Sequence, residues 1–412
     1  MKLQGPPTTA PGILSRLSRR DVLKVTGLAA LTGTAGCGPS ATIEPRIPVP
    51  TFESLGLRPF INCWGTITML SGSLMLPEVK MAMMEASNHY IHIPKLMEAV
   101  GRRLSELTGA EWGCITSGAA GALVGATAAC ITGKDQKLIS MLPDTTGMKN
   151  EVLVSSRHRV GYDRCVRQVG VTMIEVDSAE EMESKINDRT AMIFILGSGI
   201  DRGNISLEEM VSIGKKHGVP TLVDAAAERP DVPNIYIEGG VDLLCYSGGK
   251  CMRGPQASGV LLGRKDLIEA AFLNCAPHLA IGRPSKVGKE EIMGALTAVD
   301  MWVNGRDHDA EWKEWERMLN YISDAVSSIS SVTTEIRQPG SRADHNPTLS
   351  ISWDQNTVRI EPRQVIDQLL EGDPSIVIPG GRGGVSIAPY MMEEGDEIPV
   401  AKRLTEILSG AV

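Results

Sequence analysis

The stretch Tyr246–Leu267, YSGGKCMRGPQASGVLLGRKDL, places Lys250 between a glycine pair and a Gly-Pro turn. Apolar residues typical of buried strands lie on both sides of the turn, in VDLLCYS before it and in SGVLLG after it. Glycines permit unusual backbone conformations and let another group approach the backbone closely. The pattern therefore predicts a chargeable side chain at the mouth of a buried strand, beside backbone that leaves room for a ligand.

Outward from this stretch, short apolar segments alternate with helical patterns. EVLVSS, VTMIEV, TAMIFIL and VPTLVD have the composition of buried strands, and Ser206-Leu207-Glu208-Glu209 is a capping box that starts a helix. Such alternation predicts an α/β fold with a mainly parallel sheet covered on both faces. Past Leu273, a helical region over 289–330 leads into TLSISWD, SIVIPG and GVSIAP, with helices near Gln364 and from Ile398. This part predicts a smaller α+β C-terminal domain.

The composition limits the classes of function. A chain of 412 residues is long enough for one large and one smaller domain. Its net charge of -8 argues against a nucleic-acid partner, and it contains no apolar run of about 18 residues or more. The eight cysteines form no C-x-x-C pair and no metal spacing with the seven histidines. We interpret them as scattered core residues rather than as disulfide partners or metal ligands.

The first residues resemble an export signal. SRRDVLK at 18–24 follows the twin-arginine pattern and precedes a modest apolar stretch over 25–35. Thr34-Ala35-Gly36 before Cys37 resembles a lipobox, although Thr34 departs from the usual leucine. The alternative is a basic N-terminus without structure. We expect a twin-arginine signal over 1–37, a Pro-rich tether over 38–58, and an exported protein that is periplasmic or anchored as a lipoprotein through Cys37.

Four polar stretches follow predicted strands, at 116–118, at 155–158, at Asp224 and at 247–250. In sheets of this type, ligands bind at the carboxyl ends of the strands, where these stretches are expected to converge. The first of them, within TSGAAGAL, is a strand-to-helix turn of small residues. Its free N–H groups, on Gly118, Ala119 and Ala120 after Ser117, are a candidate phosphate seat. Alternatively, small residues there serve close helix packing.

Asp224 and Lys250 add complementary chemistry. A carboxylate at the end of a buried strand requires a partner, and a protonated pyridine nitrogen is a suitable one. A partly desolvated lysine forms a Schiff base with an aldehyde, and Ser247 lies close enough in sequence to donate to the same phosphate. Taken alone, Asp224 is equally consistent with a helix N-cap, and Ser-Gly-Gly-Lys with a surface turn. Together they describe a site for pyridoxal 5′-phosphate (PLP), with no metal.

The order TSGA, VDAA, SGGK resembles the aspartate-aminotransferase-like superfamily, the fold-type I PLP enzymes. The match narrows in INCWGTITMLSGSLMLPEV, SSRHRVGYDRCVRQVGVTMIEV, GNISLEEMVSIGKKHGVPTLVDAAAERP and IGRPSKVGKEEIMGAL. These segments are similar to the branch that contains bacterial selenocysteine synthase and D-glucosaminate-6-phosphate ammonia-lyase. The resemblance covers residues 59–299 and implies a PLP-binding large domain over 59–300, followed by linking helices and a small domain over 301–412.

The resemblance also implies roles for individual residues. Lys250 would form the internal aldimine, Asp224 would face the ring nitrogen, and Ser247 would contact the phosphate together with Gly118 and Ala119. His158 stands where the superfamily often stacks a ring on the cofactor, although a structural histidine is an equal alternative.

Substrate recognition is less well defined by the sequence. Arg283 and Lys286 would extend from a partner subunit to a phosphate or a substrate acid. Alternatively, they belong to a basic turn exposed to solvent. Many relatives bind the substrate carboxylate with an arginine in a pattern such as RIS-P. This chain reads GVSIAP there and offers Arg382, four residues before Ser386, as a substitute.

We therefore expect a PLP-dependent lyase that acts on a small amino acid or amino sugar acid. The reaction would proceed through an external aldimine and α-proton abstraction, with β-elimination and release of ammonia. The alternatives are an amino acid racemase, another PLP transferase, or an exported binding protein of the same fold without catalysis. Relatives build each site at a subunit interface, so we expect a homodimer or a larger even assembly.

Overall fold

The computed structural model describes residues 47–381 and 383–412. The chain divides at Leu57: residues 47–57, with a 3-10 turn at Glu53–Leu55, belong to a unit separate from Arg58–Val412. The predicted export signal and Cys37 lie outside the described residues, and so does Arg382. Within the described ranges, no helix has the length and hydrophobicity needed to cross a bilayer.

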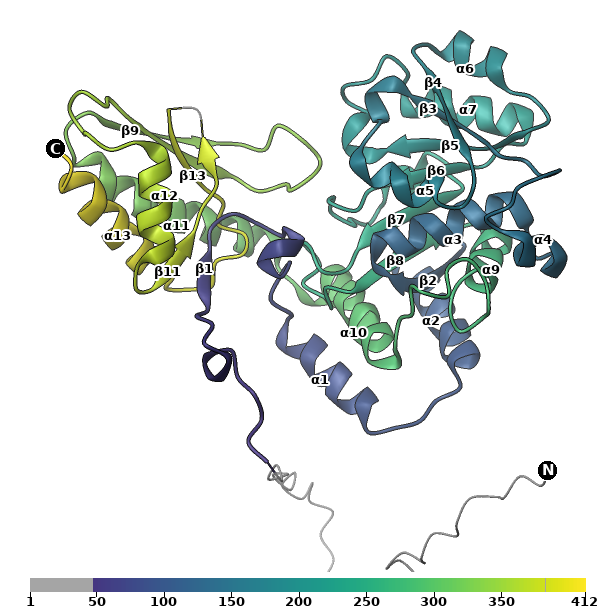
Figure 1. Ribbon diagram of the computed structural model, residues 1–412, viewed down its shortest axis with the longest axis horizontal. Coiled ribbons are helices and arrows are strands. Elements are labelled where there is room, and N and C mark those ends of the chain that lie inside the picture. The colour runs from purple at the N-terminus through teal and green to yellow at the C-terminus, as the bar shows by residue number, and fades with distance from the viewer. Residues whose placement is uncertain (1–46, 382) are drawn as a thin grey trace, which may run out of the picture. The chain divides into compact units, whose positions relative to one another are not determined.

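Seven strands form the large sheet of the second unit, in the order β2-β8-β7-β6-β5-β3-β4 (Figure 1). All neighbouring pairs are parallel except those that β8 makes with β7 and β2. The predicted α/β class with a mainly parallel sheet is confirmed. The strands are β2 (Trp112–Ser117), β3 (Glu151–Ser155), β4 (Thr172–Val176), β5 (Thr190–Leu196), β6 (Thr221–Asp224), β7 (Leu243–Ser247) and β8 (Ser258–Gly263).

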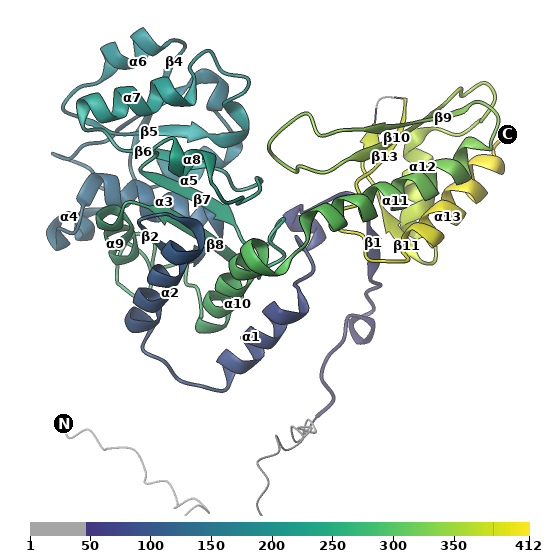
Figure 2. The ribbon, with the colours of Figure 1, turned by 180° about the vertical axis from the view of Figure 1, so that it is seen from behind.

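Helices pack against this sheet, and Figure 2 shows them from behind. Helix α3 contacts β7 and β8, and α7 contacts β5 and β6. The predicted capping box at Ser206 and Glu209 starts α7. The helices are α1 (Pro77–Ser87), α2 (Ile93–Thr108), α3 (Gly118–Thr132), α4 (Gln136–Met141), α5 (Arg164–Arg167), α6 (Ala179–Lys185), α7 (Leu207–His217), α8 (Ile235–Glu238), α9 (Lys265–Leu273) and α10 (Lys289–Asp300).

The composition of these elements explains their burial. In β5, the side chains from Thr190 to Ile195 are all buried, as expected of a central strand covered on both faces. In α3, the small residues let the helix approach α9. A methyl group added at Gly125 would lie 3.3 Å from the Ala271 carbonyl oxygen of α9 and 2.7 Å from the sulfur of Cys275, just after that helix. The close packing predicted as an alternative use of the small residues is therefore present further along the same helix.

A second core surrounds a four-stranded antiparallel sheet of order β12-β13-β10-β9. β1 pairs in parallel with β11 and contributes Ile61 to this core, so the segment that begins the predicted large domain packs with the small one. The elements are β1 (Phe60–Asn62), β9 (Val332–Arg337), β10 (Thr348–Trp353), β11 (Ser375–Val377), β12 (Gly380–Gly381), β13 (Gly384–Ile387), α11 (His308–Ser327), α12 (Pro362–Glu371) and α13 (Glu397–Ser409). Between α10 and α11, Met301–Gly305 is a π-helix.

Candidate active site

A cavity of about 370 Å³ lies at the carboxyl ends of the large sheet. Residues that follow four of its strands, β2, β5, β6 and β7, form most of the wall, as the sequence predicted for a parallel sheet. The residues that line the cavity are Thr68, Gly118, Ala119, Ala120, Leu123, Val160, Tyr162, Leu196, Ser198, Arg202, Asp224, Ala225, Ala226, Ala227, Glu228, Ser247, Lys250, Gln256 and Ala343.

Lys250 lies half-buried on this wall, in the turn between β7 and β8. The turn is tight because Gly248 donates its N–H to the Ser258 carbonyl at 2.8 Å and accepts one from Gly254, also at 2.8 Å. A methyl group added at Gly249 would lie 2.4 Å from the Gln256 Cα atom. The glycines that surround the lysine in the sequence therefore allow the turn to pack against the start of β8, which holds the lysine at the cavity.

Asp224 ends β6 and is only 5% exposed. Its Oδ1 accepts the Ala226 N–H at 3.0 Å and lies 3.8 Å from the Cys245 sulfur, which can donate to it. Burial raises the pKa of Asp224, whereas the Ala226 N–H and the positive charge of Lys250 lower it. A desolvated carboxylate of this kind gains from a cationic partner. The protonated ring nitrogen of PLP fits this requirement.

The N-terminus of α3 supplies the candidate phosphate seat. Gly118 has a φ of 66° and no atom within 4 Å of the position of an added methyl group, so the space beside it is open. Gly118, Ala119 and Ala120 line the cavity, at the end of the helix where free N–H groups favour an anion. Ser247 lines the same cavity. Ser117, in contrast, lines a smaller cavity beside Cys114 and Cys275.

His158 does not line the main cavity. Its side chain is fully buried, and its ring packs against the backbone after β5. A methyl group at Gly199 would lie 2.6 Å from the ring, and one at Gly203 would lie 3.2 Å from it. Burial lowers the pKa of His158, so the ring is neutral at pH 7. Val160 and Tyr162 follow it in the chain and reach the cavity wall instead.

The basic residues predicted for substrate binding are not brought to Lys250 within this chain. Arg283 and Lys286 line a separate cavity of about 700 Å³, together with Ile139, Leu142 and other residues of their own loop. Arg382 is outside the described residues.

Two charged residues on the main cavity wall were missed in the sequence. Arg202 donates from Nε and Nη2 to the Ser198 carbonyl at 3.2 and 2.9 Å, and it makes no ion pair with a carboxylate in the described part of the chain. Glu228 lies four residues after Asp224 in VDAAAE and is 5% exposed. The second acid in that motif was the available signal for Glu228, whereas no pattern distinguished Arg202.

A loop that follows β9 also reaches the cavity. Ala343 lines it, and Asp344 donates its N–H to the Ala227 carbonyl at 2.9 Å. The Asp344 side chain accepts the Tyr390 hydroxyl at 3.0 Å, and Tyr390 in turn accepts the Thr66 N–H at 3.2 Å. Residues of the C-terminal part therefore form one side of the site.

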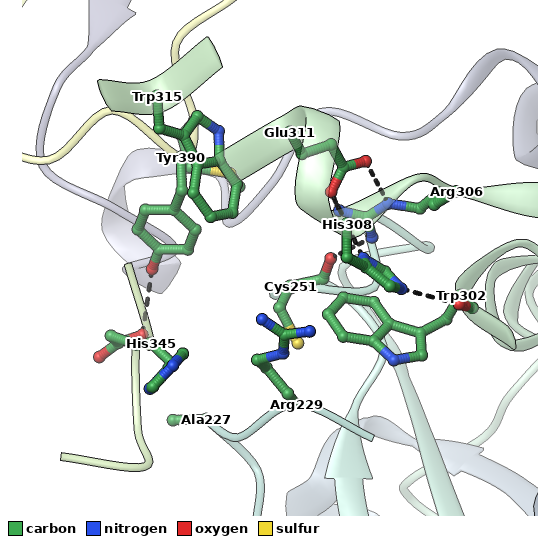
Figure 3. A pocket seen from close by; sticks show the side chains of 12 residues that line it. Ala227, Arg229, Cys251, Trp302, Arg306, His308, Glu311, Trp315, His345 and Tyr390 are labelled. Carbon is green, nitrogen blue, oxygen red and sulfur yellow. Dashed lines mark hydrogen bonds and ion pairs between the residues drawn. The ribbon is translucent and has the colours of Figure 1, made fainter. Parts of the chain in front are cut away.

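A neighbouring pocket of about 20 Å³ is filled by charged and aromatic side chains (Figure 3). Arg306 donates from Nε and Nη2 to both Glu311 oxygens at 2.7 Å and lies over the Trp302 ring at 4.7 Å. Burial raises the pKa of Glu311, but His308 and Arg306 outweigh burial and lower this pKa to about 2. The pairing of Arg306 with Glu311 and the small volume leave this pocket little capacity for a ligand.

Comparisons with known proteins agree with this geometry. The pattern of the family described as Aminotransferase class-V matches residues 165–282, which include Asp224 and Lys250. A D-glucosaminate-6-phosphate ammonia-lyase of Salmonella typhimurium is 30% identical over 375 residues, which are 87% of this chain and 98% of the relative. A solved structure of a D-glucosaminate-6-phosphate ammonia-lyase, also 30% identical, covers 88% of this chain and 100% of its own with a TM-score of 0.78.

Other relatives carry different names. A 5′-C-glycyluridine monooxygenase-decarboxylase of a Streptomyces species is 29% identical over 375 residues, 87% of this chain and 92% of the relative. An L-seryl-tRNA(Sec) selenium transferase of Escherichia fergusonii is 27% identical over 245 residues, and the alignment spans about half of each chain. The expected resemblance to the ammonia-lyase and selenocysteine synthase branch is confirmed.

Proposed function

Because the chain belongs to the family of PLP-dependent enzymes that contains D-glucosaminate-6-phosphate ammonia-lyase, we propose that it is a PLP-dependent lyase for a small amino acid or amino sugar acid. The observation that carries this proposal is the convergence of Lys250, Asp224 and the N-terminus of α3 on one cavity. These are the three groups that bind the aldehyde, the ring nitrogen and the phosphate of the cofactor.

The described residues fit PLP. Lys250 would hold its aldehyde carbon, Asp224 its ring nitrogen, and Ser247 with Gly118 and Ala119 its phosphate. When bound, PLP acts as an electron sink that stabilises negative charge on the carbon next to the substrate amino group.

The chain's own residues then have separate tasks. The Lys250 amine would remove the proton from that carbon as general base. Asp224, as an anion, would balance the charge of a protonated ring nitrogen. Ala343 and the loop around it limit the access of water from one side.

We assign recognition of the substrate carboxylate to Arg202. Its guanidinium lines the cavity, is oriented by the Ser198 carbonyl, and has no carboxylate partner in the described ranges. Other arginines are engaged: Arg342 pairs with Asp201 at 3.0 Å, and Arg253 pairs with Glu393 at 2.6 Å. A guanidinium on the wall of the cavity that also contains Lys250 suits a carboxylate, which it can bind through two parallel hydrogen bonds.

The experiment that tests the proposed function is product analysis with a panel of amino acids and amino sugar acids. A lyase releases ammonia and a keto acid, a racemase inverts the substrate without release, and a binding protein leaves it unchanged. The monooxygenase-decarboxylase relative adds a fourth outcome, which is loss of carbon dioxide with consumption of oxygen. Release of ammonia without oxygen uptake is the expected result.

We also propose that the active unit is a homodimer or a larger even assembly. Helix α1 and the residues after it expose large apolar side chains, among them Met81 (71%), Met84 (70%) and Tyr90. Arg283 and Lys286 lie on a separate cavity, which is consistent with their serving a partner subunit. Sedimentation of the active enzyme as a monomer would contradict this assembly.

Export by the twin-arginine route, with lipidation of Cys37 as a further step, is proposed from the sequence. SRRDVLK and the following apolar stretch support export, and the residues before Cys37 support the anchor. Export in the folded state would let the enzyme acquire its cofactor in the cytoplasm. The enzyme would then act in the periplasm or at its membrane surface.

A further inference from the structure

Glu228 is a second acid on the wall of the active-site cavity. It is 5% exposed and lies in the chain between Asp224, at the end of β6, and Asn234, which caps α8. It also lines a second cavity of about 370 Å³, which contains Arg342 and Tyr246. Glu228 therefore lies where the two cavities adjoin.

The Glu228 carboxyl group is held on both sides. The Tyr236 hydroxyl lies 2.7 Å from Oε2 and donates to it, and Tyr236 itself is 1% exposed. On the other side, a methyl group added at Gly197 would lie 2.2 Å from Oε1, so this position requires a glycine. Oε1 is buried and has no hydrogen-bond partner among the described residues.

A carboxyl group in this position retains a proton more readily than one in water. No described residue makes an ion pair with it, and Arg342, the cation that lowers its pKa, pairs with Asp201 instead. Burial is the largest effect and raises the pKa of Glu228 to about 7, although the Tyr236 hydroxyl and Arg342 lower it; the charges of Asp224 and Asp201 add smaller increases. The groups that face it are Tyr236 on α8, Arg342 in the loop after β9, Asp224 at the end of β6, Asp201 after β5 and Tyr246 on β7.

We propose that Glu228 is the proton donor to the leaving group of the elimination. This inference rests on the proposed lyase function. It names a residue for departure of the leaving group, which neither Lys250 nor Asp224 assists. Lys250 is occupied as the base, and Asp224 must stay ionised beside the ring nitrogen. Of the acids that line the cavity within the described chain, Glu228 is the one that these tasks leave free.

The step balances without a further reactant. Lys250 takes the proton of the carbon that bears the amino group, and the electron pair of that C–H bond forms a carbon–carbon double bond. The bond from the adjacent carbon to its hydroxyl oxygen breaks, and the oxygen keeps the electron pair. The proton of Glu228 joins this oxygen, and water leaves. Lys250 releases its proton to solvent, solvent returns one to Glu228, and addition of one water to the unsaturated amine gives ammonia and the keto acid.

The first test separates proton donation from proton removal. In deuterated water, Glu228→Gln should retain exchange of the α-hydrogen, which needs only Lys250, while elimination falls by roughly 100- to 10,000-fold, the range for loss of a general acid. Glutamine keeps the size and a hydrogen-bond donor but cannot transfer a proton. The matched control is Glu238→Gln on the exposed side of α8, which should leave both rates unchanged.

The second test needs no catalysis. The pKa of Glu228 is about 7 in the folded apoprotein and 4.5 in the unfolded chain. Between these two pH values, the carboxyl group therefore holds its proton only in the folded state. Stability should therefore fall as pH rises from about 4.5 to about 7, then level off. Glu228→Gln should lose this part of the pH dependence, and Tyr236→Phe, which removes a hydrogen bond that lowers the pKa, should shift it to higher pH.

The outcomes are distinguishable. Elimination by Glu228→Gln at the wild-type rate, or an identical pH dependence of stability in the variant and the wild-type apoprotein, would overturn the inference and leave the lyase proposal intact. Absence of both α-hydrogen exchange and ammonia release in the wild type, over the whole substrate panel, would overturn the lyase proposal and the Glu228 inference with it.

Discussion

Lys250 and Asp224 line one cavity without forming an ion pair, and burial raises the pKa of Asp224 although the positive charge of Lys250 partly offsets this increase. They belong to the ends of neighbouring parallel strands, β6 and β7, in which Asp224 pairs with Cys245. An ion pair between them would occupy both groups that the cofactor needs. Their separation leaves the lysine free for an aldehyde and the carboxylate free for a ring nitrogen.

Replacing Lys250 with alanine should abolish both activity and the visible absorption of the bound cofactor. No other described residue on the cavity wall has an amine that could form the Schiff base. Lys250→Arg retains the positive charge and should fail equally, which distinguishes covalent attachment from electrostatics. Absorption spectra of the purified variants provide the measurement, and an unchanged visible band in either would remove Lys250 from this role.

Asp224→Asn should weaken cofactor retention and reduce kcat by roughly 100-fold or more, because a neutral amide cannot balance the charge of a protonated ring. The substitution keeps the size of the side chain, so the effect does not come from a cavity. Cofactor loss during dialysis and turnover under saturating cofactor are the two measurements. Near-normal turnover would exclude a pairing between Asp224 and the ring nitrogen.

Arg202→Gln should raise KM for a carboxylate substrate by roughly 10- to 100-fold, as expected when a charged hydrogen bond is lost. The KM for a carboxamide analogue of the same substrate should change little in this variant, because a neutral amide does not form an ion pair with the guanidinium. Arg102→Gln, at an exposed position on α2, serves as the control. If KM rose to the same extent for both substrates, Arg202 would be supporting the fold and not binding the carboxylate.

Glu311→Gln should destabilise the protein by about 2 kcal/mol, because Arg306 would lose a charged partner at two hydrogen bonds. The pKa of Glu311 is about 2 in the fold and near 4.5 when unfolded, so the unfolded state binds more protons between these values. Its contribution to stability is complete above about pH 4.5 and declines as pH falls toward 2.

Thermal melts of the wild type and the Glu311→Gln variant should therefore converge as the buffer becomes acidic. The exposed pair of Glu335 with Arg337 offers a control, since Glu335→Gln should change stability by less than about 1 kcal/mol. If the difference in melting temperature between the wild type and Glu311→Gln stayed constant from pH 6 to acidic pH, ionisation of Glu311 would not contribute to stability.

Replacing Arg19 and Arg20 together with lysine should leave active, cofactor-loaded enzyme in the cytoplasm, because the twin-arginine pair would be lost. Fractionation of cells that express each form measures this directly. Continued export of the double variant would refute the route. Incorporation of a lipid precursor into the wild type, but not into Cys37→Ser, would test the anchor separately.

Much of the site was predictable because parallel strands end at one edge. The order of TSGA, VDAA and SGGK along the chain was sufficient to place Gly118, Asp224 and Lys250 at that edge. Both the α/β class and the capping box of α7 followed from local patterns. These features depend on residues close together in the sequence.

The remainder depends on tertiary contacts that local patterns do not encode. His158 follows β3 as expected, but Gly199 and Gly203 leave space for its ring away from the cavity. The positions of Glu228 and Arg202 depend on Gly197 and on the Ser198 carbonyl, which lie in the 3-10 turn after β5. The pairing of Phe60 with Ser375 joins the two ends of the described unit, and neither short segment carries a signal for it.

The turn that carries Lys250 connects β7 and β8, which pair antiparallel from Ser247 with Gly259 onward. Both ends of the connection that carries Lys250 therefore lie in central strands of the sheet, and the hydrogen bonds of Gly248 with Ser258 and Gly254 hold the backbone between them. Backbone tied to central strands in this way belongs to the more stable part of a fold. The apoprotein should therefore already hold its lysine in place, so that little conformational entropy is lost when the cofactor arrives.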